Sequence, residues 1–261
     1  MKPFVLLNAN FEKDRAVLDV RYPDAVRAAG GIPWILPAPS GAEAETGSLR
    51  GILRSVHAVL LVGGPDYDPA RWGEPRHPRA NPVHERREAF DPLLASLVLE
   101  ARLPVLGICA GHQVLAVATG GSILQHLGRD DQVSPHENGS RHGCRIGEGS
   151  LLARVLGGTA FEVNSYHHQA VDPGRPGLGL RTCAQAEPPV RRKREGGADE
   201  ALPFVPCVEA AEAADGAPAI GVQWHPERIL DEPAGFPLFR WLVEEARKRA
   251  RRESPEGALH P

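Results

Sequence analysis

Short apolar runs alternate with amphipathic segments through the first half of the chain. In the runs nearly every residue is hydrophobic, whereas between them apolar residues recur every three or four positions. The first pattern is typical of strands buried on both faces, and the second of helices that cover a sheet. The predicted strands are Phe4 to Ala9, Ile32 to Pro37, Ala58 to Gly64 and Val105 to Ile108, and the predicted helices are Tyr22 to Ala29, Leu49 to Ser55 and Arg86 to Arg102. This alternation predicts an α/β fold with an open, mostly parallel sheet and helices on both faces.

The second half of the chain is richer in strand patterns. Extra strands are predicted at Cys144 to Ile146, Phe161 to Val163, Leu180 to Ala186, Val205 to Ala210 and Ala219 to Trp224. A terminal helix is predicted from Pro237 to Arg249. We therefore expect a single domain over residues 1–252, followed by a disordered tail at 253–261.

One internal segment, Glu187 to Ala201, contains almost no apolar residues. Its run of four basic residues, Arg191 to Arg194, is a pattern that also occurs in nucleic-acid-binding patches. Acidic residues follow at once and cancel the positive field, so we expect a mobile, solvated insertion at 187–201.

Composition narrows the class of protein further. The chain has a net charge of −3 and 42% hydrophobic residues, as in an ordinary soluble globular protein. No global basic field favours nucleic acid or an anionic membrane as a partner. No apolar stretch approaches the length of a membrane span, the amino terminus has no signal-peptide cleavage pattern, and the four cysteines form no CxxC pair. We expect a cytoplasmic, reduced protein.

Glycines flank one cysteine at the end of the fourth predicted strand. Cys109 lies in the run GICAG, between Gly107 and Gly111. This pattern is the thiol version of the nucleophile elbow, a tight strand-to-helix turn that lifts a reactive atom clear of the sheet. A β-carbon at either glycine would crowd neighbouring elements, and the positive end of the following helix favours a thiolate. Cys109 is therefore the predicted nucleophile, whereas the other three cysteines are expected to be small buried hydrophobes.

A candidate base and its carboxylate partner follow the last predicted strand. In the run AIGVQWHPE, His225 and Glu227 are separated by Pro226. Proline disfavours a helical conformation in the residue before it, so we expect extended chain, in which residues two apart share a face. Glu227 would then orient the imidazole of His225 toward the cysteine. Cys109, His225 and Glu227 form the predicted catalytic triad.

Acyl chemistry on a thiol also needs hydrogen-bond donors for an oxyanion. The backbone N–H of Ala110, at the start of the helix after the elbow, is one candidate. The backbone N–H of Gly64 is another, because the Gly63-Gly64 turn ends a neighbouring strand. Taken alone, the two glycines are better explained as a simple strand-ending turn.

Together these motifs resemble the class I glutamine amidotransferase superfamily, with GICAGHQ as its nucleophile motif and GVQWHPE as its His-x-Glu motif. Within it the chain most resembles the gamma-glutamyl-gamma-aminobutyrate hydrolase family. That similarity lies in GGPDYDPARWGE (63–74), GGSILQHL (120–127) and VNSYHHQAV (163–171), and the resemblance covers nearly the whole chain. It implies a flavodoxin-like sheet, a Cys-His-Glu triad, no cofactor and a place in polyamine catabolism.

The resemblance also places a set of residues near the bound glutamyl group. They are Gly63, Arg87, Gln113, Ser165, Tyr166, His167, His168 and Gln169. The adjacent histidines His167 and His168 also suggest a metal site. No further ligand pair has a suitable spacing, so no metal is expected.

The chain departs from the family's pattern at two positions. The family commonly has an arginine directly after the cysteine, where this chain has Ala110, and an Arg-Asp pair where this chain has Arg87 and Glu88. We expect the small side chain of Ala110 to leave space on the leaving-group side of Cys109. That space would broaden the range of amines accepted.

Three functions are compatible with these motifs. The first is a hydrolase that cleaves a γ-glutamyl amide to glutamate and a free amine through a glutamyl thioester. The second is a glutaminase subunit that delivers ammonia to a separate synthetase partner, and the third is a non-catalytic binding protein on the same scaffold. The expected ligand is a small γ-glutamyl compound rather than nucleic acid or a membrane, and a homodimer is compatible with the sequence.

Overall fold

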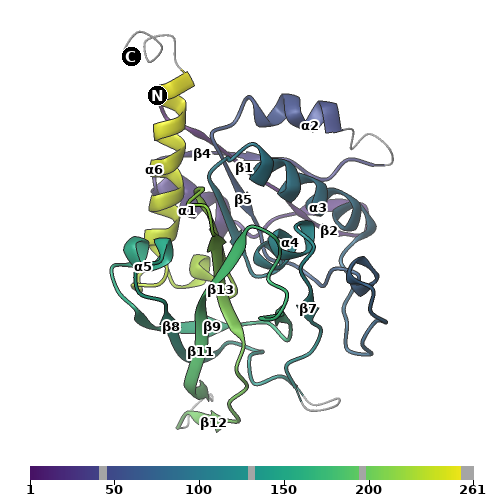
Figure 1. Cartoon of the computed structure of the whole chain (residues 1–261), viewed down its shortest axis with the longest axis vertical. Helices are drawn as coiled ribbons and strands as arrows, with labels where there is room; N and C mark the ends of the chain where they lie inside the picture. Colours follow the sequence, from purple (N-terminus) through teal and green to yellow (C-terminus); the bar gives the residue numbers. More distant parts are fainter. Residues whose placement is uncertain (41–45, 129–132, 194–197, 254–261) are drawn as a thin grey trace.

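The computed structural model describes residues 1–253 except 41–45, 129–132 and 194–197. Within these residues one central sheet has the order β4-β1-β5-β6-β14-β13-β11-β8-β9, and β12 pairs with β11 (Figure 1). The first five of these strands are parallel to one another, and the remaining pairs are antiparallel. The strands are β1 (Phe4–Leu7), β4 (Ile32–Ile35), β5 (Ala58–Leu61), β6 (Val105–Ile108), β8 (Ser140–Ile146), β9 (Ala160–Ser165), β11 (Leu180–Arg192), β12 (Glu200–Leu202), β13 (Val208–Ala213) and β14 (Ala219–Val222).

Helices cover both faces of this sheet. One face is covered by α1 (Arg21–Ala28), α5 (Leu151–Leu156) and α6 (Phe236–Glu253), and the other by α2 (Thr46–Leu53), α3 (Glu85–Glu100) and α4 (Ala110–Ala118). Two short antiparallel ribbons, β2 (Asn10–Glu12) with β3 (Arg15–Val17) and β7 (Ile123–Leu124) with β10 (Ala170–Val171), lie outside the sheet. The predicted α/β fold is confirmed. Four of the extra strands, β8, β9, β11 and β13, form the antiparallel part of the sheet, whereas the fifth, β14, is parallel to β6.

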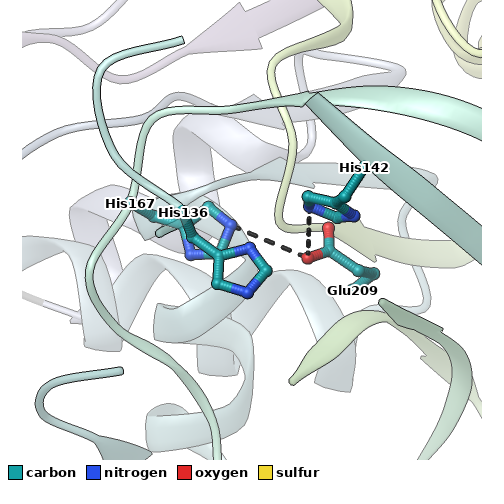
Figure 2. Close-up of side chains that lie close together, drawn as sticks. All are labelled: His136, His142, His167 and Glu209. Atoms are coloured by element: carbon teal, nitrogen blue, oxygen red, sulfur yellow. Dashed lines mark ion pairs between the residues drawn. The ribbon is translucent and has the colours of Figure 1, made fainter. Parts of the chain in front are cut away.

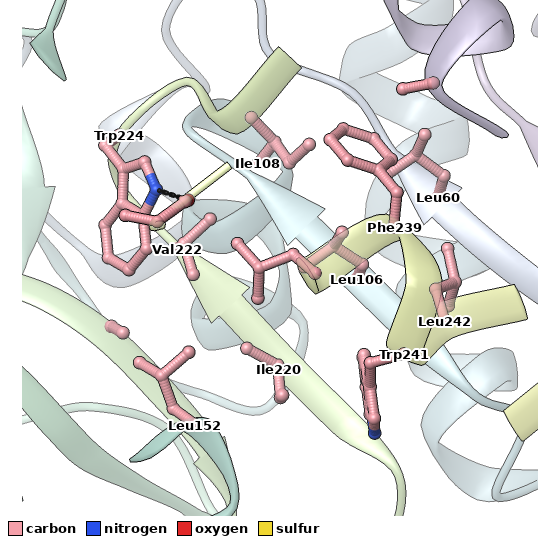
Figure 3. Close-up of a cluster of buried hydrophobic side chains, with 14 of the residues drawn as sticks. Leu60, Leu106, Ile108, Leu152, Ile220, Val222, Trp224, Phe239, Trp241 and Leu242 are labelled. Atoms are coloured by element: carbon pink, nitrogen blue, oxygen red, sulfur yellow. Dashed lines mark hydrogen bonds between the residues drawn. The ribbon is translucent and has the colours of Figure 1, made fainter. Parts of the chain in front are cut away.

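The central strands are apolar at every position because they have a hydrophobic layer on each side. Along β6, Leu106 and Ile108 point into one apolar cluster, whereas Val105 points into the other. This alternation follows from the two-residue period of a strand. In Figure 3 the side chains of Leu106 and Ile108 lie beside those of Ile220 and Val222 on the neighbouring β14. Phe239, Trp241 and Leu242 of α6 lie opposite them. The two strands that carry the candidate chemistry are thus held between two buried apolar layers.

The segment at 187–201 differs from the prediction. Residues 187–192 continue β11, and β12 pairs back on it with Val190 opposite Leu202. Val190 is 2% exposed, so this stretch does bury an apolar side chain. The sequence prediction of a solvated insertion missed these strand residues, because charged residues dominate the composition of the segment. An edge strand can carry many charged residues, since every second side chain can face solvent. Residues 194–197 lie outside the described part of the chain.

The carboxyl end also extends beyond the prediction. Helix α6 continues to Glu253, past the expected end at Arg249. The predicted tail, apart from that residue, lies outside the described residues. Among the helices that the structure describes, none is both long and apolar enough to cross a bilayer.

Replacing Phe239 with alanine should destabilise the protein strongly. Its ring is fully buried between α6 and the parallel strands, so removal leaves a cavity (Figure 3). We expect the free energy of unfolding to fall by about 3–5 kcal/mol. Urea unfolding followed by circular dichroism measures this, with the exposed Arg240→Ala change on the same helix as the control. A loss below about 1 kcal/mol for Phe239→Ala would contradict the packing described here.

Candidate active site

The candidate nucleophile lies in a strained turn between β6 and α4. Cys109 has φ 52° and ψ −109°, a conformation that L-residues rarely adopt. A β-carbon on Gly111 would lie 2.0 Å from the Leu61 carbonyl oxygen, and one on Gly107 would lie 2.5 Å from the Gly111 carbonyl oxygen. Only glycine fits at either position. The structural reason predicted for the two glycines is therefore confirmed.

The candidate base reaches the cysteine because β14 and β6 are parallel neighbours. Val222 at the end of β14 pairs with Ile108 at the end of β6, and the Cys109 N–H donates to the Val222 carbonyl at 2.8 Å. Residues that follow these two strands therefore emerge at the same edge of the sheet. His225 is one of them, and its ring lies against the Gly63 turn beside the Cys109 β-carbon.

Glu227 holds the imidazole as predicted, but by a different backbone geometry. The chain from Pro226 to Arg228 forms one turn of 3₁₀ helix rather than extended strand. That turn still brings the Glu227 carboxylate to 2.7 Å from Nδ1 of His225. Because Nδ1–H donates to the carboxylate, Nε2 is the nitrogen left for the cysteine.

The charges in this group favour a protonated imidazole. Burial lowers the pKa of His225, but the charges of Cys109 and Glu227 and hydrogen bonds to both side chains outweigh it and raise that pKa to about 10. An imidazolium beside the sulfur is the partner that a thiolate needs. The imidazole of His225 is thus protonated across the neutral range.

Two further residues support the site, and neither was identified from the sequence. Asn164 on β9 accepts from the His225 N–H at 2.8 Å and donates to the His225 carbonyl at 2.9 Å, so it fixes the backbone of the base. The Tyr22 hydroxyl accepts from the Gly63 N–H at 3.2 Å. Burial raises the pKa of Tyr22 well above its usual value, and the charges of Glu227 and Cys109 raise it further, so the hydroxyl stays neutral. Asn164 lies inside the quoted motif VNSYHHQAV and could have been identified from it, whereas Tyr22 lies in no motif.

A cavity of about 410 Å³ opens beside the cysteine at the carboxyl end of the sheet. Six of the predicted substrate-binding or oxyanion residues line it together with Cys109, as do three charged residues that the sequence did not single out. The predicted ones are Gly64, Gln113, Tyr166, His167, His168 and Gln169, and the charged additions are Asp66, Arg79 and Glu137. Gln113 donates to Gln223, whose amide in turn contacts the Cys109 sulfur at 3.6 Å.

Arg87 lies beneath the cavity wall rather than in the cavity. It is fully buried, forms an ion pair with Asp91 at 2.5 Å and donates to the carbonyls of Val62 and Gly63 at 3.3 and 3.2 Å. A β-carbon on Gly64 would lie 2.2 Å from this guanidinium. Arg87 therefore supports the Gly63-Gly64 turn from the interior and does not line the cavity.

Two other predicted residues face away from the cavity. The Ser165 hydroxyl is buried and lies 3.4 Å from Nδ1 of His136, on the interior side of its segment. Ala110 is 1% exposed and packs in the apolar cluster under α3 and α4. Ala110 is not among the residues that line the cavity, and the expected effect of its small side chain on the choice of amine stays a prediction.

These features define an α/β protein that groups a cysteine, a histidine and a glutamate at the carboxyl end of its parallel strands. The chain belongs to the Peptidase C26 family, whose model matches residues 7–190. A Mycobacterium tuberculosis protein named "Putative glutamine amidotransferase Rv2859c" is 33% identical over 265 residues, which cover 97% of this chain and 78% of that protein. The gamma-glutamyl-gamma-aminobutyrate hydrolase PuuD of Escherichia coli K12 is 30% identical, covering 87% of this chain and 84% of the relative. The family resemblance inferred from the sequence motifs is confirmed.

Solved structures agree on the fold. The glutaminase domain of Trypanosoma brucei CTPS with bound acivicin superposes with a TM-score of 0.65 over 95% of both chains, at 16% sequence identity. A glutamine amidotransferase of Thermotoga maritima superposes with a TM-score of 0.59 over 94% of this chain and 98% of that one, at 17% identity. At this identity the likeness is one of fold alone.

The pKa of His225 offers a direct test of the triad's charge arrangement. We expect NMR titration of histidine-labelled protein to place it near 10, with assignment from a His225→Gln variant. Replacing Cys109 with alanine should lower that pKa, because it removes a negative partner and a hydrogen bond while burial still opposes the charge. His84→Gln, at the N-cap of α3, serves as the control. A His225 pKa unchanged by Cys109→Ala would mean that the two side chains do not interact.

Proposed function

We propose that this chain is a cysteine-dependent hydrolase that cleaves a γ-glutamyl amide to glutamate and a free amine. The observation that carries the proposal is the His225–Glu227 pair beside Cys109 at the mouth of a polar cavity. The strained elbow, the charged dyad and the adjacent cavity together supply a nucleophile, a base and room for a small polar substrate.

The reaction divides into two steps at one carbonyl carbon. The Cys109 thiolate attacks the γ-carbonyl, a C–S bond forms, and the C–N bond breaks as the amine leaves with a proton from Nε2 of His225. Water then attacks the glutamyl thioester and gives its proton to the neutral imidazole. The C–S bond breaks, glutamate leaves, and the thiolate–imidazolium pair is restored. Glu227 stays ionised and holds the ring in place throughout.

The backbone N–H groups of Gly64 and Ala110 are proposed to bind the oxyanion. Within the described residues neither N–H forms a hydrogen bond, whereas the Gly63 N–H is taken by Tyr22. Ala110 is also the first residue of α4, so the positive end of the helix adds to the field there.

The charges around the cavity match a γ-glutamyl group, which carries one α-ammonium and one α-carboxylate. Asp66 and Glu137 present carboxylates and Arg79 presents a guanidinium, with Arg79 and Glu137 3.6 Å apart. We assign the carboxylates to the ammonium and the guanidinium to the substrate carboxylate. His168 orients Asp66 through a contact of 3.0 Å from Nε2.

The relatives support two substrates for such a site. The E. coli relative is named for a γ-glutamyl amine, whereas the M. tuberculosis relative is named for glutamine. A glutaminase subunit with a separate synthetase partner is therefore the second candidate. It uses the same chemistry with ammonia as the leaving group.

A substrate comparison separates the two candidates. Glutamate release by the purified chain would be measured with γ-glutamyl-γ-aminobutyrate, an uncharged γ-glutamyl alkylamide and glutamine. We expect both γ-glutamyl amides to be cleaved without any added protein, with a higher kcat/KM than glutamine. Cys109→Ala should lower kcat by at least about 10⁴-fold, because no other group replaces the nucleophile.

The matched control is Cys183→Ala, which makes the same change at a buried cysteine of the core. It should retain activity. Release from glutamine alone, and only on adding a second protein, would favour the glutaminase subunit. Glutamate release unaffected by Cys109→Ala would overturn both candidates.

A further inference from the structure

Four side chains with metal-binding atoms meet in the interior behind the cavity (Figure 2). They are His136, His142, His167 and Glu209, from the segment before β8, from β8, from the segment after β9 and from β13. One ligand atom from each lies within 4.8 Å of those of the others, and all four residues are buried. The cluster is assembled only by the fold, since its members span more than seventy positions of the sequence.

Each of the three imidazoles uses one ring nitrogen on a backbone carbonyl. Nδ1 of His142 lies 2.9 Å from the Gly143 oxygen, Nδ1 of His167 lies 2.9 Å from the Gln169 oxygen, and Nε2 of His136 lies 2.8 Å from the Val205 oxygen. A carbonyl oxygen only accepts, so each of these nitrogens carries the hydrogen. In the neutral ring the other nitrogen therefore holds a lone pair. Such carbonyl bonds orient histidines that bind metals.

Two of the three lone-pair nitrogens face one carboxylate, whereas the third, Nδ1 of His136, lies 3.4 Å from the Ser165 hydroxyl. Nε2 of His142 and Nε2 of His167 lie 3.3 and 3.7 Å from the same oxygen of Glu209, and Figure 2 draws both contacts. Among the described residues these two nitrogens and the second Glu209 oxygen have no hydrogen-bond partner. Lone pairs that face a buried carboxylate repel it unless a positive charge lies between them, which either a proton or a metal ion can supply.

We propose that His136, His142, His167 and Glu209 bind one divalent transition-metal ion, best matched by Zn²⁺. Three imidazole nitrogens and one carboxylate oxygen form the four-coordinate donor set that zinc takes in proteins, with bonds of about 2.0–2.2 Å. The side chains draw together on binding, because tetrahedral ligands lie closer to one another than 4.8 Å. Cys207 stays a neighbour of the site, since its thiol donates to Glu209 at 3.2 Å.

The ion would act as a clamp on the cavity wall. His167 lines the cavity and belongs to the run Tyr166–Gln169, three other members of which also line it. A closed site with four protein ligands is structural rather than catalytic. The metal would therefore tie this run to β8 and β13 of the sheet. This proposal replaces the expectation of no metal, which considered only the pair His167 and His168, whereas His168 turns to Asp66.

Zinc titration of chelator-stripped protein tests the site. The Cys109→Ala chain is used, so that the Cys109–His225 pair takes up no zinc, and a chromophoric indicator competes for the metal. We expect one ion per chain. Glu209→Gln keeps the side chain's size but removes its charge, and should weaken zinc binding by at least about 100-fold. This loss is larger than that expected for a residue that only orients a ligand.

The matched control is His168→Gln, a histidine next to a ligand but outside the cluster, which should keep the affinity of its parent. Because a buried change can unfold the chain, the parent is also crystallised with zinc, and anomalous scattering should locate the ion among the four side chains. Absence of saturable binding, equal binding by Glu209→Gln, or an anomalous peak elsewhere would each overturn the proposal.

Discussion

The strained backbone at Cys109 is the constraint on which the site depends. A positive φ at a non-glycine residue persists only where the surrounding structure determines it, and here three features do so. The Cys109 N–H is held by the Val222 carbonyl, and the helix that follows packs so closely on β5 that Gly111 has no room for a side chain. The two apolar layers on β6 and β14 then keep the strands in register.

Buried polar groups behind this turn hold the residues around Cys109 in place. Arg87 supports the Gly63-Gly64 turn from below, and Asn164 fixes the backbone of His225. Each acts through hydrogen bonds in the interior, where an unpaired group costs about 1–3 kcal/mol. Such a support is stable only when all of its partners are in place, so the catalytic geometry is coupled to the packing of the whole sheet.

Local patterns were sufficient to predict the fold and the grouping of Cys109, His225 and Glu227. Cys109 lies in a five-residue motif, and His225 and Glu227 are two residues apart, so their chemistry is readable from neighbours in sequence. The interior cluster could not be predicted in this way, because His136, His142 and Glu209 lie in no local motif. They meet only through the antiparallel strands. The sequence also could not predict which way a side chain points. Arg87 and Ser165 were both expected in the site, but both side chains are buried in the interior and do not line the cavity.

The proposed mechanism requires a glutamyl group on Cys109, and rapid acid quenching detects that group directly. The chain would be mixed with γ-glutamyl p-nitroanilide, quenched at increasing times and digested for mass spectrometry. We expect a peptide containing Cys109 to gain the mass of one glutamyl group during turnover, while the peptides containing Cys144, Cys183 and Cys207 stay unmodified. Release of p-nitroaniline with Cys109 unmodified at every time point, or with the glutamyl group on another residue, would rule out this mechanism.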